Sequence, residues 1–578
     1  MIKILMKSIR EFKKPAILTM VIVFFEVIME CIIPFVVAIL VNKIEAGCEL
    51  SVIAKYGALL IAMAIVSLTC GAMAGNFCAT ASCGFARNLR KDMFEKIQNF
   101  SFENIDKFQT SSLVTRLTTD VTNVQHAFMM LIRTAIRSPF MLIFSFVMGF
   151  IMGGKIAFVY VAVIPILFSG LIIIARKAMP LFRRVFKKYD NLNNSIQENI
   201  KGMRVVKSFV REDYEKNKFD VAATDVCNDF TKAERILAWN GPIMQFCLNT
   251  IMIVILTFGS SYVVKTMGAE VNVGQLSGLL TYGFQILMSL MMISMIYVMI
   301  TMSVESAERI VEVLKEESVL KNCKNPITDI KDGSIDFNHV SFKYGSSKMI
   351  LNDIDLHIKS GETIGILGGT GSAKTTLVQL IPRLYDVTDG EVLVGGTNVK
   401  EYDLETLRNN VAVVLQKNIL FSGTIKENLR WGKEDATISE MVHVCKLAQA
   451  DDFINSFPKK YDTYIEQGGA NVSGGQKQRL CIARALLKEP KIIIFDDSTS
   501  AVDTKTDALI RKGMREYIPN TTKIIIAQRV ASVSDADKII VMDNGNIVGI
   551  GTHEYLIKNN EIYREVYESQ NKVGENDE

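Results

Sequence analysis

The sequence has little of what would indicate a disulfide-stabilised, zinc-binding or nucleic-acid-binding protein. Its ten cysteines form no C-x-x-C pair. They therefore predict neither a disulfide framework nor a zinc site, and are typical of small apolar packing residues in a reducing setting. The net charge is only +4 over 578 residues. Such a small excess gives no reason to expect a nucleic-acid partner.

The N-terminal segment also lacks the cleavage site of a signal peptide. Residues 1–14 carry five lysines and arginines among apolar residues, and a long apolar run follows them. That run is longer than the apolar region of a signal peptide. We expect residues 1–14 to form a cytoplasmic interfacial (elbow) helix that leads into a first membrane span.

Long apolar runs, in contrast, are abundant. Hydrophobic residues make up 49% of the chain and the mean hydropathy is +0.23. A span needs roughly 20 apolar residues. Six runs meet this need, the third being the shortest: residues 15–42, 52–83, 138–154, 156–175, 241–264 and 271–304. These runs predict six transmembrane helices and exclude a soluble enzyme with an incidental apolar core.

The loops between the runs alternate in length and charge. Residues 84–137 and 176–240 are long and polar, and the second loop is rich in lysine and arginine. The opposite loops are short and carry few basic residues. Cytoplasmic loops carry the excess of Lys and Arg. We therefore expect the long loops and both termini of a multi-pass cell-membrane (plasma or inner membrane) protein to be cytoplasmic.

Two features inside the runs bear on a transported substrate. Glu26 and Glu30 lie four residues apart on one face of the first span, where ionised carboxylates are costly. They are explained either by pairing with a basic group at a wetted helix surface or by a cavity that holds cations.

A methionine stripe at helical spacing runs along the sixth span. Helix packing explains such a stripe, and so does the adaptable wall of a promiscuous cavity. The residues are Met288, Met292, Met295, Met299 and Met302.

The second half of the chain contains a glycine-rich turn between an apolar strand and a helix start. It matches G-x-x-x-x-G-K-[ST] except that alanine stands at the last glycine, and it comprises Gly368, Gly369, Thr370, Gly371, Ser372, Ala373, Lys374, Thr375 and Thr376. The backbone N–H groups of such a turn bind phosphate. Lys374 would reach the β- and γ-phosphates of a nucleotide, and the Thr375 hydroxyl would bind Mg²⁺.

Two further segments fit a nucleotide site. An apolar strand at 491–495 ends in Asp496 and Asp497, where a carboxylate can hold Mg²⁺. The segment 472–479 opens a helix with Ser473, Gly474, Gly475 and Gln476, which makes a second phosphate-facing helix N-terminus. Two such sites about a hundred residues apart make sense when two copies face each other, each covering the other's nucleotide.

Six spans followed by these motifs resemble an ATP-binding cassette (ABC) exporter half-transporter of type IV over nearly the whole chain. The resemblance implies six transmembrane helices with long cytoplasmic extensions, fused to an α/β P-loop ATPase domain with a helical subdomain. The domain limits are 15–315 for the transmembrane domain, 316–333 for a linker, 334–570 for the nucleotide-binding domain and 571–578 for a polar tail.

The resemblance also implies roles for individual residues. Tyr344 would stack on adenine, and Gln416 would reach both the metal and the transmembrane contacts. Ser473 to Gln476 would bind the ATP of the opposite subunit, and Asp503 would line the dimer seam. Segments near 110–121 and 204–214 resemble the coupling helices that touch the cassettes.

Two positions depart from the family pattern. Asp497 stands where glutamate usually polarises the attacking water, and Gln528 stands where a switch histidine is usual. Glutamine carries no titratable proton. This chain should therefore bind ATP well and cleave it slowly. It resembles the degenerate half of bacterial heterodimeric multidrug exporters, whose partner supplies the usual glutamate and histidine; a homodimer with two slow sites is the alternative.

The predicted function is ATP-driven export of lipophilic or amphipathic compounds by alternating access, with ATP and Mg²⁺ as cofactors. The predicted partners are a second ABC half-transporter, the lipid bilayer and a small lipophilic substrate. The alternatives are a lipid flippase, a peptide exporter and a regulatory or ATP-gated subunit. We expect no peptidase-like extension before the first span, which weakens the peptide alternative, and importers of this superfamily usually keep spans and cassette on separate chains.

Overall fold

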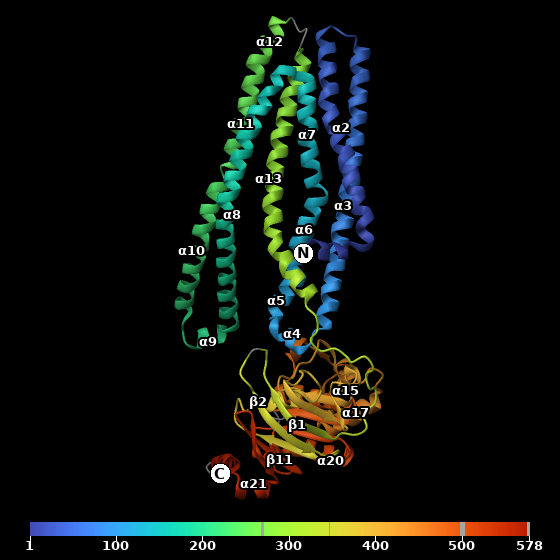
Figure 1. Cartoon of the computed structure of the whole chain (residues 1–578), viewed down its shortest axis with the longest axis vertical. Helices are drawn as coiled ribbons and strands as arrows, with labels where there is room; N and C mark the ends of the chain where they lie inside the picture. Colours follow the sequence, from blue (N-terminus) through green and yellow to red (C-terminus); the bar gives the residue numbers. More distant parts are fainter. Residues whose placement is uncertain (267–270, 346, 498–502, 575–578) are drawn as a thin grey trace. The chain divides into compact units, whose positions relative to one another are not determined.

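The computed structural model describes residues 1–266, 271–345, 347–497 and 503–574, which form two compact units (Figure 1). The first, which we call the helical unit, comprises Met1–Gln98 and Thr110–Glu316. The second, the sheet unit, comprises Asn99–Gln109 and Glu317–Glu578. A short segment from the first half of the chain thus belongs to the second unit.

The helical unit contains no strand among its described residues. Its helices, with η marking 3-10 and π-helical segments, are α1 (Ile2–Leu5), η1 (Met6–Phe12), α2 (Lys13–Glu45), α3 (Leu50–Gln98), α5 (Thr110–Thr115), η2 (Arg116–Asp120), α6 (Val121–Ile132), α7 (Thr134–Gly153), η3 (Gly154–Ala157), α8 (Phe158–Lys201), α9 (Met203–Ser208), α10 (Glu212–Leu237), α11 (Asn240–Val254), η4 (Ile255–Gly259), α12 (Ser260–Lys265) and α13 (Val273–Lys315).

Five continuous helical stretches in the described residues are long and apolar enough to cross a membrane: Ile2–Glu45, Leu50–Gln98, Thr110–Phe182, Glu212–Lys265 and Val273–Lys315. The third stretch holds two spans. The backbone turns at Gly154, whose φ of +49° suits glycine, and the rings of Phe150 and Phe158 then meet at 5.4 Å. The six predicted runs therefore correspond to α2, α3, α7, α8, α11 to α12, and α13.

Two buried tyrosines tie these helices together. The Tyr160 hydroxyl of α8 donates to the Leu279 carbonyl of α13 at 2.5 Å, and the Tyr282 hydroxyl of α13 donates to the Cys31 carbonyl of α2 at 2.6 Å. Both rings are fully buried. A carbonyl that accepts such a bond does so in addition to its helical partner, so these contacts cost no backbone hydrogen bond.

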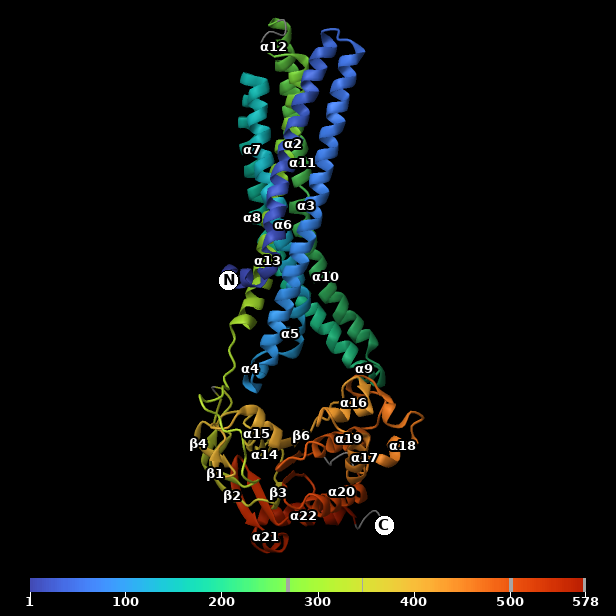
Figure 2. The same cartoon turned by 90° about the vertical axis from the view of Figure 1, so that its right-hand side faces the viewer.

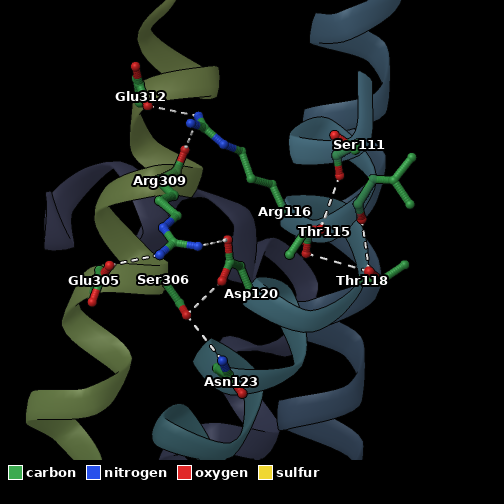
Figure 3. A network of polar contacts seen from close by, with 11 residues as sticks. Ser111, Thr115, Arg116, Thr118, Asp120, Asn123, Glu305, Ser306, Arg309 and Glu312 are labelled. Carbon is green, nitrogen blue, oxygen red and sulfur yellow. Dashed lines mark hydrogen bonds and ion pairs between the residues drawn. The ribbon is translucent and has the colours of Figure 1, made fainter. Parts of the chain in front are cut away.

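A polar network joins α13 to η2 and α6 (Figure 3). The carboxylate of Asp120, only 3% exposed, accepts from the Ser306 hydroxyl at 2.8 Å, and Asn123 donates to the same hydroxyl at 3.1 Å. Arg116 pairs with Glu312 at 2.8 Å. The π-helical turn η2 carries Arg116 and Asp120 at its two ends, and such turns re-aim the side chains they contain.

The sheet unit is an α/β structure. Its helices are α4 (Phe102–Lys107), α14 (Lys374–Gln379), α15 (Leu404–Asn410), α16 (Ile425–Arg430), α17 (Ile438–Leu447), α18 (Asp451–Ser456), η5 (Lys460–Asp462), η6 (Gln467–Gly469), α19 (Gly474–Leu486), α20 (Thr504–Tyr517), η7 (Val530–Ser532), α21 (His553–Asn559) and α22 (Glu561–Gly574). Its strands are β1 (Ile335–Phe342), β2 (Leu351–Ile358), β3 (Thr363–Leu367), β4 (Asp389–Val394), β5 (Thr397–Asn398), β6 (Val411–Val414), β7 (Gly423–Thr424), β8 (Tyr464–Ile465), β9 (Ile492–Asp496), β10 (Thr522–Ile526), β11 (Lys538–Asp543) and β12 (Asn546–Gly551).

The central sheet has the order β12-β11-β3-β10-β9-β6, and all its neighbours pair in parallel except β11 with β12. Strands β3, β9 and β10 are buried at every residue. Continuous Ile-rich runs of this kind are expected for parallel strands covered on both faces. The carboxyl ends of β3 and β9 therefore meet at one edge, which places the glycine-rich turn beside Asp496.

A second, antiparallel sheet has the order β2-β1-β4-β5. Residues 335–342 form the single strand β1, which lies between β2 and β4 (Figure 2). Its pairing with β2 shifts register between Phe337 and Val340, and His339 there has a φ of +48°. The irregularity is a β-bulge, which bends a strand without ending it.

Helix α4 lies in the sheet unit. The Asp106 carboxylate accepts from the Tyr385 hydroxyl at 2.6 Å, Asn104 donates to the Glu317 carbonyl at 3.1 Å, and the Phe102 ring contacts Tyr385. The expectation of a coupling segment at 110–121 was therefore wrong, because residues 99–109 make these contacts. A buried capping box of Ser101 and Asn104 gave the helix a start signal upstream of the expected segment.

Candidate functional site

The glycine-rich turn leaves β3 and forms an open loop of backbone. A Cβ added at Gly369 or Gly371 would meet nothing within 4 Å, so the loop leaves room beside its backbone. The Lys374 ammonium donates to the carbonyls of Gly368 and Gly369, both at 2.8 Å, and to the Ser372 hydroxyl at 3.1 Å. A loop of backbone N–H groups closed by one lysine suits a chain of phosphates.

Ala373, the residue that replaces the last glycine of the pattern, has a φ of +70°. It precedes α14 and lies in the left-handed region, where a residue with a Cβ is strained. The left-handed conformation costs an L-residue about 1–2 kcal/mol. The alanine therefore holds a conformation that glycine adopts freely.

Thr375 and Asp496 lie together at the base of the loop. The Thr375 hydroxyl donates to the Asp496 carboxylate at 2.8 Å, and Asp496 is only 4% exposed. Burial raises the pKa of Asp496, and the neighbouring Asp497 raises it further. Burial also lowers the pKa of the Lys374 ammonium. A hydroxyl and a carboxylate so placed fit Mg²⁺, which prefers hard oxygen ligands.

Asp497 is held by two amides. Gln528 donates to one carboxylate oxygen of Asp497 at 2.8 Å, and Gln416 donates to the same oxygen at 3.4 Å. Asp497 and Gln528, the two residues that we expected to depart from the family pattern, are thus direct partners. The Gln416 contact brings a predicted metal-site residue to the same carboxylate.

Ser473 to Gln476, which we call the signature, lie at the start of α19. Ser473 and Gln476 form a capping box in which each side chain accepts from the other's backbone N–H, at 3.3 and 2.9 Å. None of the hydrogen bonds found among the described residues joins Ser473, Gly474, Gly475 or Gln476 to the glycine-rich turn. The segment begins a 13-residue helix and leaves part of its N-terminus exposed.

Asp503 caps α20 by accepting from the Thr506 N–H at 2.9 Å, and this bond lowers the pKa of its carboxyl. The residues just before Asp503, Ser500 to Val502, lie outside the described residues.

Tyr344 packs in an aromatic cluster. Its ring meets Phe342 and Tyr385 edge-on at 4.8 and 5.1 Å, and its hydroxyl lies 3.2 Å from that of Thr376. The structure thus places the predicted adenine-stacking residue beside the first turn of α14. The same cluster includes the tyrosine that binds α4.

In the helical unit, Arg137 holds both predicted carboxylates. One guanidinium nitrogen donates to Glu26 at 3.1 Å, and the other donates to both oxygens of Glu30 at 2.7 and 2.8 Å. Glu26 is 4% exposed. The pairing joins α2 to α7 and offsets much of the cost of charge inside a span.

The methionine stripe on α13 faces outward from this chain. Met292 and Met295 are 41% and 54% exposed, while Met288 and Met299 are half-buried. Met288 and Met292 line a cavity of ≈540 Å³ that also includes Arg133 and Arg137.

Sequence reasoning missed both arginines. Arg133 and Arg137 are four residues apart, as are Glu26 and Glu30. This matching spacing was the signal in the sequence that the two pairs could face each other.

Comparison with known proteins places the chain in one family along its length. Residues 16–291 match the ABC transporter transmembrane region, and residues 351–500 match the ABC transporter family. The chain is 35% identical to the uncharacterized ABC transporter ATP-binding protein YfiB of Bacillus subtilis (strain 168), over 98% of each chain. It is 32% identical to an ATP-dependent lipid A-core flippase of Desulfotalea psychrophila, over 84% of each.

The fold is also that of a solved exporter. A bacterial Atm1-family ABC exporter with ATP bound superposes with a TM-score of 0.84, over 96% of this chain and 99% of that chain, at 22% identity. The type IV exporter fold predicted from the motifs is thereby confirmed. The chain belongs to the ABC transporter family, as a multi-pass exporter half-transporter whose ATP-binding domain couples ATP hydrolysis to transport.

Proposed function

We propose that this chain is the slow-hydrolysing half of a heterodimeric multidrug exporter, which moves lipophilic or amphipathic compounds outward by alternating access. The observation that supports this most is the pair formed by Asp497 and Gln528, 2.8 Å apart. Both residues stand where the family resemblance leads us to expect glutamate and histidine. A partner half-transporter with the usual residues would then carry the fast site.

Different residues of this chain's own site would bind different parts of the nucleotide. The backbone N–H groups of Gly369 to Ala373 and the Lys374 ammonium would hold the phosphates. Thr375, Asp496 and Gln416 would hold Mg²⁺, which when bound neutralises phosphate charge. Tyr344 would contact the adenine.

Slow hydrolysis follows from the length of one side chain. Aspartate is one methylene shorter than glutamate, so its carboxylate is withdrawn by about 1 Å, and such a misplacement can cost about a hundredfold in rate. Gln528 ties that carboxylate with an amide that carries no titratable proton. The site would then act as a long-lived ATP clamp.

The signature would serve the partner. Ser473 to Gln476 would bind the γ-phosphate of ATP held by the opposite subunit, and Asp503 would line the seam between the two. ATP between the cassettes draws them together and opens the spans outward, and hydrolysis at the partner's site resets them. The nucleotide-binding domain and both termini would be cytoplasmic.

A homodimeric lipid flippase is the second candidate. It is favoured by one relative that is named an ATP-dependent lipid A-core flippase. The composition of the complex separates the two candidates, because only the heterodimer needs a second gene product.

The experiment is to tag this chain, extract it from its native membrane and identify the stoichiometric partner. A related half-transporter with glutamate and histidine at the two altered positions supports the proposal. Purification of this chain with only its own copies contradicts the heterodimer.

Photolabelling with a reactive ATP analogue tests the site itself. Lys374→Ala should abolish labelling of this chain, while Lys459→Ala, at an exposed lysine of the same unit, should not. Undiminished labelling of Lys374→Ala would refute the nucleotide assignment.

A further inference from the structure

The cavity of ≈540 Å³ in the helical unit lies among the end of α6, the start of α7 and the middle of α13. Its volume is within the range of sites that hold drug-sized ligands. Its walls combine methionines with a few polar groups, among them Arg133, Arg137 and Gln285. The chemistry of those polar groups decides which ligand the cavity suits.

The cationic groups line the cavity, and the carboxylates lie behind them. Arg137 and Arg133 both line the wall, whereas Glu26 and Glu30 do not. Both glutamates lie on α2 and are bound by the Arg137 guanidinium. The carboxylates therefore occupy both terminal guanidinium nitrogens of Arg137, and neither carboxylate lines the cavity.

Arg133 differs from Arg137. Among the residues that the structure describes, its half-buried guanidinium makes no hydrogen bond and no ion pair. A guanidinium carries five N–H donors and stays charged, so it matches a planar or tetrahedral oxyanion. Its charge interacts electrostatically with Glu26. Its N–H donors have no bonded partner among the described residues, so an anionic ligand in the cavity could accept from them.

The rest of the wall suits an apolar body beside that charge. Met288 and Met292 offer flexible thioether side chains that adapt to irregular shapes. Gln285 lies at the back of the same wall, where its amide oxygen accepts from Ser145 at 2.8 Å. One charged group next to adaptable apolar groups fits an amphipathic molecule with a single anionic head.

We propose that this cavity binds a lipophilic anion, whose carboxylate, sulfonate or phosphate pairs with Arg133 while its apolar part lies against Met288 and Met292. The inference rests on the proposed export function and gives it a substrate class. It also replaces the cation-holding alternative for Glu26 and Glu30, which here serve to fix Arg137.

The test compares two dyes of similar aromatic framework and opposite charge, fluorescein (anionic) and rhodamine 123 (cationic). Equilibrium binding to the purified full complex in nanodiscs is measured by fluorescence anisotropy. Arg133→Gln should weaken fluorescein binding about tenfold, as expected for loss of a charge-assisted hydrogen bond. Rhodamine 123 binding should not weaken. Arg133→Lys should recover most of the fluorescein affinity, because the charge returns.

The matched control is Arg176→Gln, the same chemical change at an exposed arginine of α8 that does not line the cavity. It should leave fluorescein affinity within twofold. The melting temperature of each variant complex verifies folding. If Arg133→Gln weakens both dyes equally, or leaves fluorescein binding within twofold, the inference is overturned.

Two further experiments follow. The first decides whether the anion is a lipid headgroup or a soluble molecule, and the second tests the export function. Fluorescein binding is repeated with phosphatidylglycerol and with phosphatidylcholine alone in the nanodisc. Competition by phosphatidylglycerol identifies a lipid headgroup as the ligand, and its absence identifies a soluble anion. ATP-driven fluorescein uptake into inverted vesicles tests export separately: Arg133-dependent binding without uptake upholds the site and contradicts the export function.

Discussion

Ala373 and Asp497 both have positive φ, at +70° and +47°. Both are positions at which the resemblance led us to expect another residue. Aspartate tolerates the left-handed region better than alanine, because its side chain can hydrogen-bond locally. The alanine in the glycine-rich turn is therefore the strained residue of the two. Replacing it with glycine, which deletes one methyl group, should relieve the strain.

We expect Ala373→Gly to raise the free energy of unfolding by about 0.5–1 kcal/mol, the left-handed cost less the extra freedom of glycine in the unfolded chain. Chemical denaturation of the purified complex measures this. Ala508→Gly, at an exposed helical position in α20, is the control and should lower stability by about 1 kcal/mol. A fall in stability for both variants would contradict the strain.

Restoring the two altered residues should restore hydrolysis. We expect Asp497→Glu combined with Gln528→His to raise single-turnover ATP cleavage at this chain's site by about a hundredfold. The assay uses a complex whose partner carboxylate has been removed, so that only this site contributes. A rate within threefold of the starting complex would mean that neither residue limits hydrolysis.

At the scale of elements, the C-terminal part of α13 is held to η2 by the buried carboxylate of Asp120. Asp120 accepts from Ser306, and Arg309 lies at 4.0 Å from its second oxygen. Figure 3 shows these side chains converging from the two helices. The hydroxyl of Ser306 is thus one of the few groups that satisfy Asp120.

Ser306→Ala should destabilise the complex by about 1–3 kcal/mol, because it removes a donor from a buried charged group. Thr301→Val is the matched control, since the Thr301 hydroxyl donates only to the carbonyl of Tyr297 in its own helix, and it should stay within about 0.5 kcal/mol. Melting of both variants in detergent provides the measurement. Equal losses would show that the network does not hold the helices.

The sequence could predict elements whose signal is local. The apolar runs of the spans and the strand–turn–helix pattern around Lys374 depend on neighbouring residues only, and both were found. Arg137 as the partner of Glu26 depends on a contact between residues 111 positions apart, which a single sequence does not encode. The conformation of Ala373 depends on the loop that surrounds it.

Contacts across the chain also explain the remaining errors. The segment 110–121 resembled a coupling helix, but the aromatic surface around Tyr385 determines which segment docks, and that surface forms only in the folded sheet unit. Gln528 was identified as a departure, but its bond to Asp497 required the ends of β9 and β10 to be adjacent.

At the scale of the whole molecule, α4 is the point at which the first half of the chain enters the sheet unit. The Tyr385 hydroxyl binds Asp106, and burial raises the pKa of that tyrosine well above its ordinary value. The phenol therefore stays neutral and able to donate throughout the physiological pH range.

Tyr385→Phe should leave ATP binding intact and lower transport per ATP hydrolysed by about tenfold, since a hydrogen bond to a charged group contributes about 1.5–3 kcal/mol. Vesicle uptake and ATPase activity, measured on one preparation, give the ratio. Tyr555→Phe, at an exposed ring of the same unit, should leave the ratio unchanged. An unchanged ratio in Tyr385→Phe would show that this bond does not transmit motion.

The membership of residues 99–109 in the sheet unit has a consequence for building hybrid transporters. A cassette transplanted from this chain as residues 317–578 alone would arrive without its own α4, and Tyr385 would face a foreign helix with no guarantee of a carboxylate at the position of Asp106. The module that this chain could exchange is therefore discontinuous in sequence. A functional graft has to carry the short helix together with the cassette it binds.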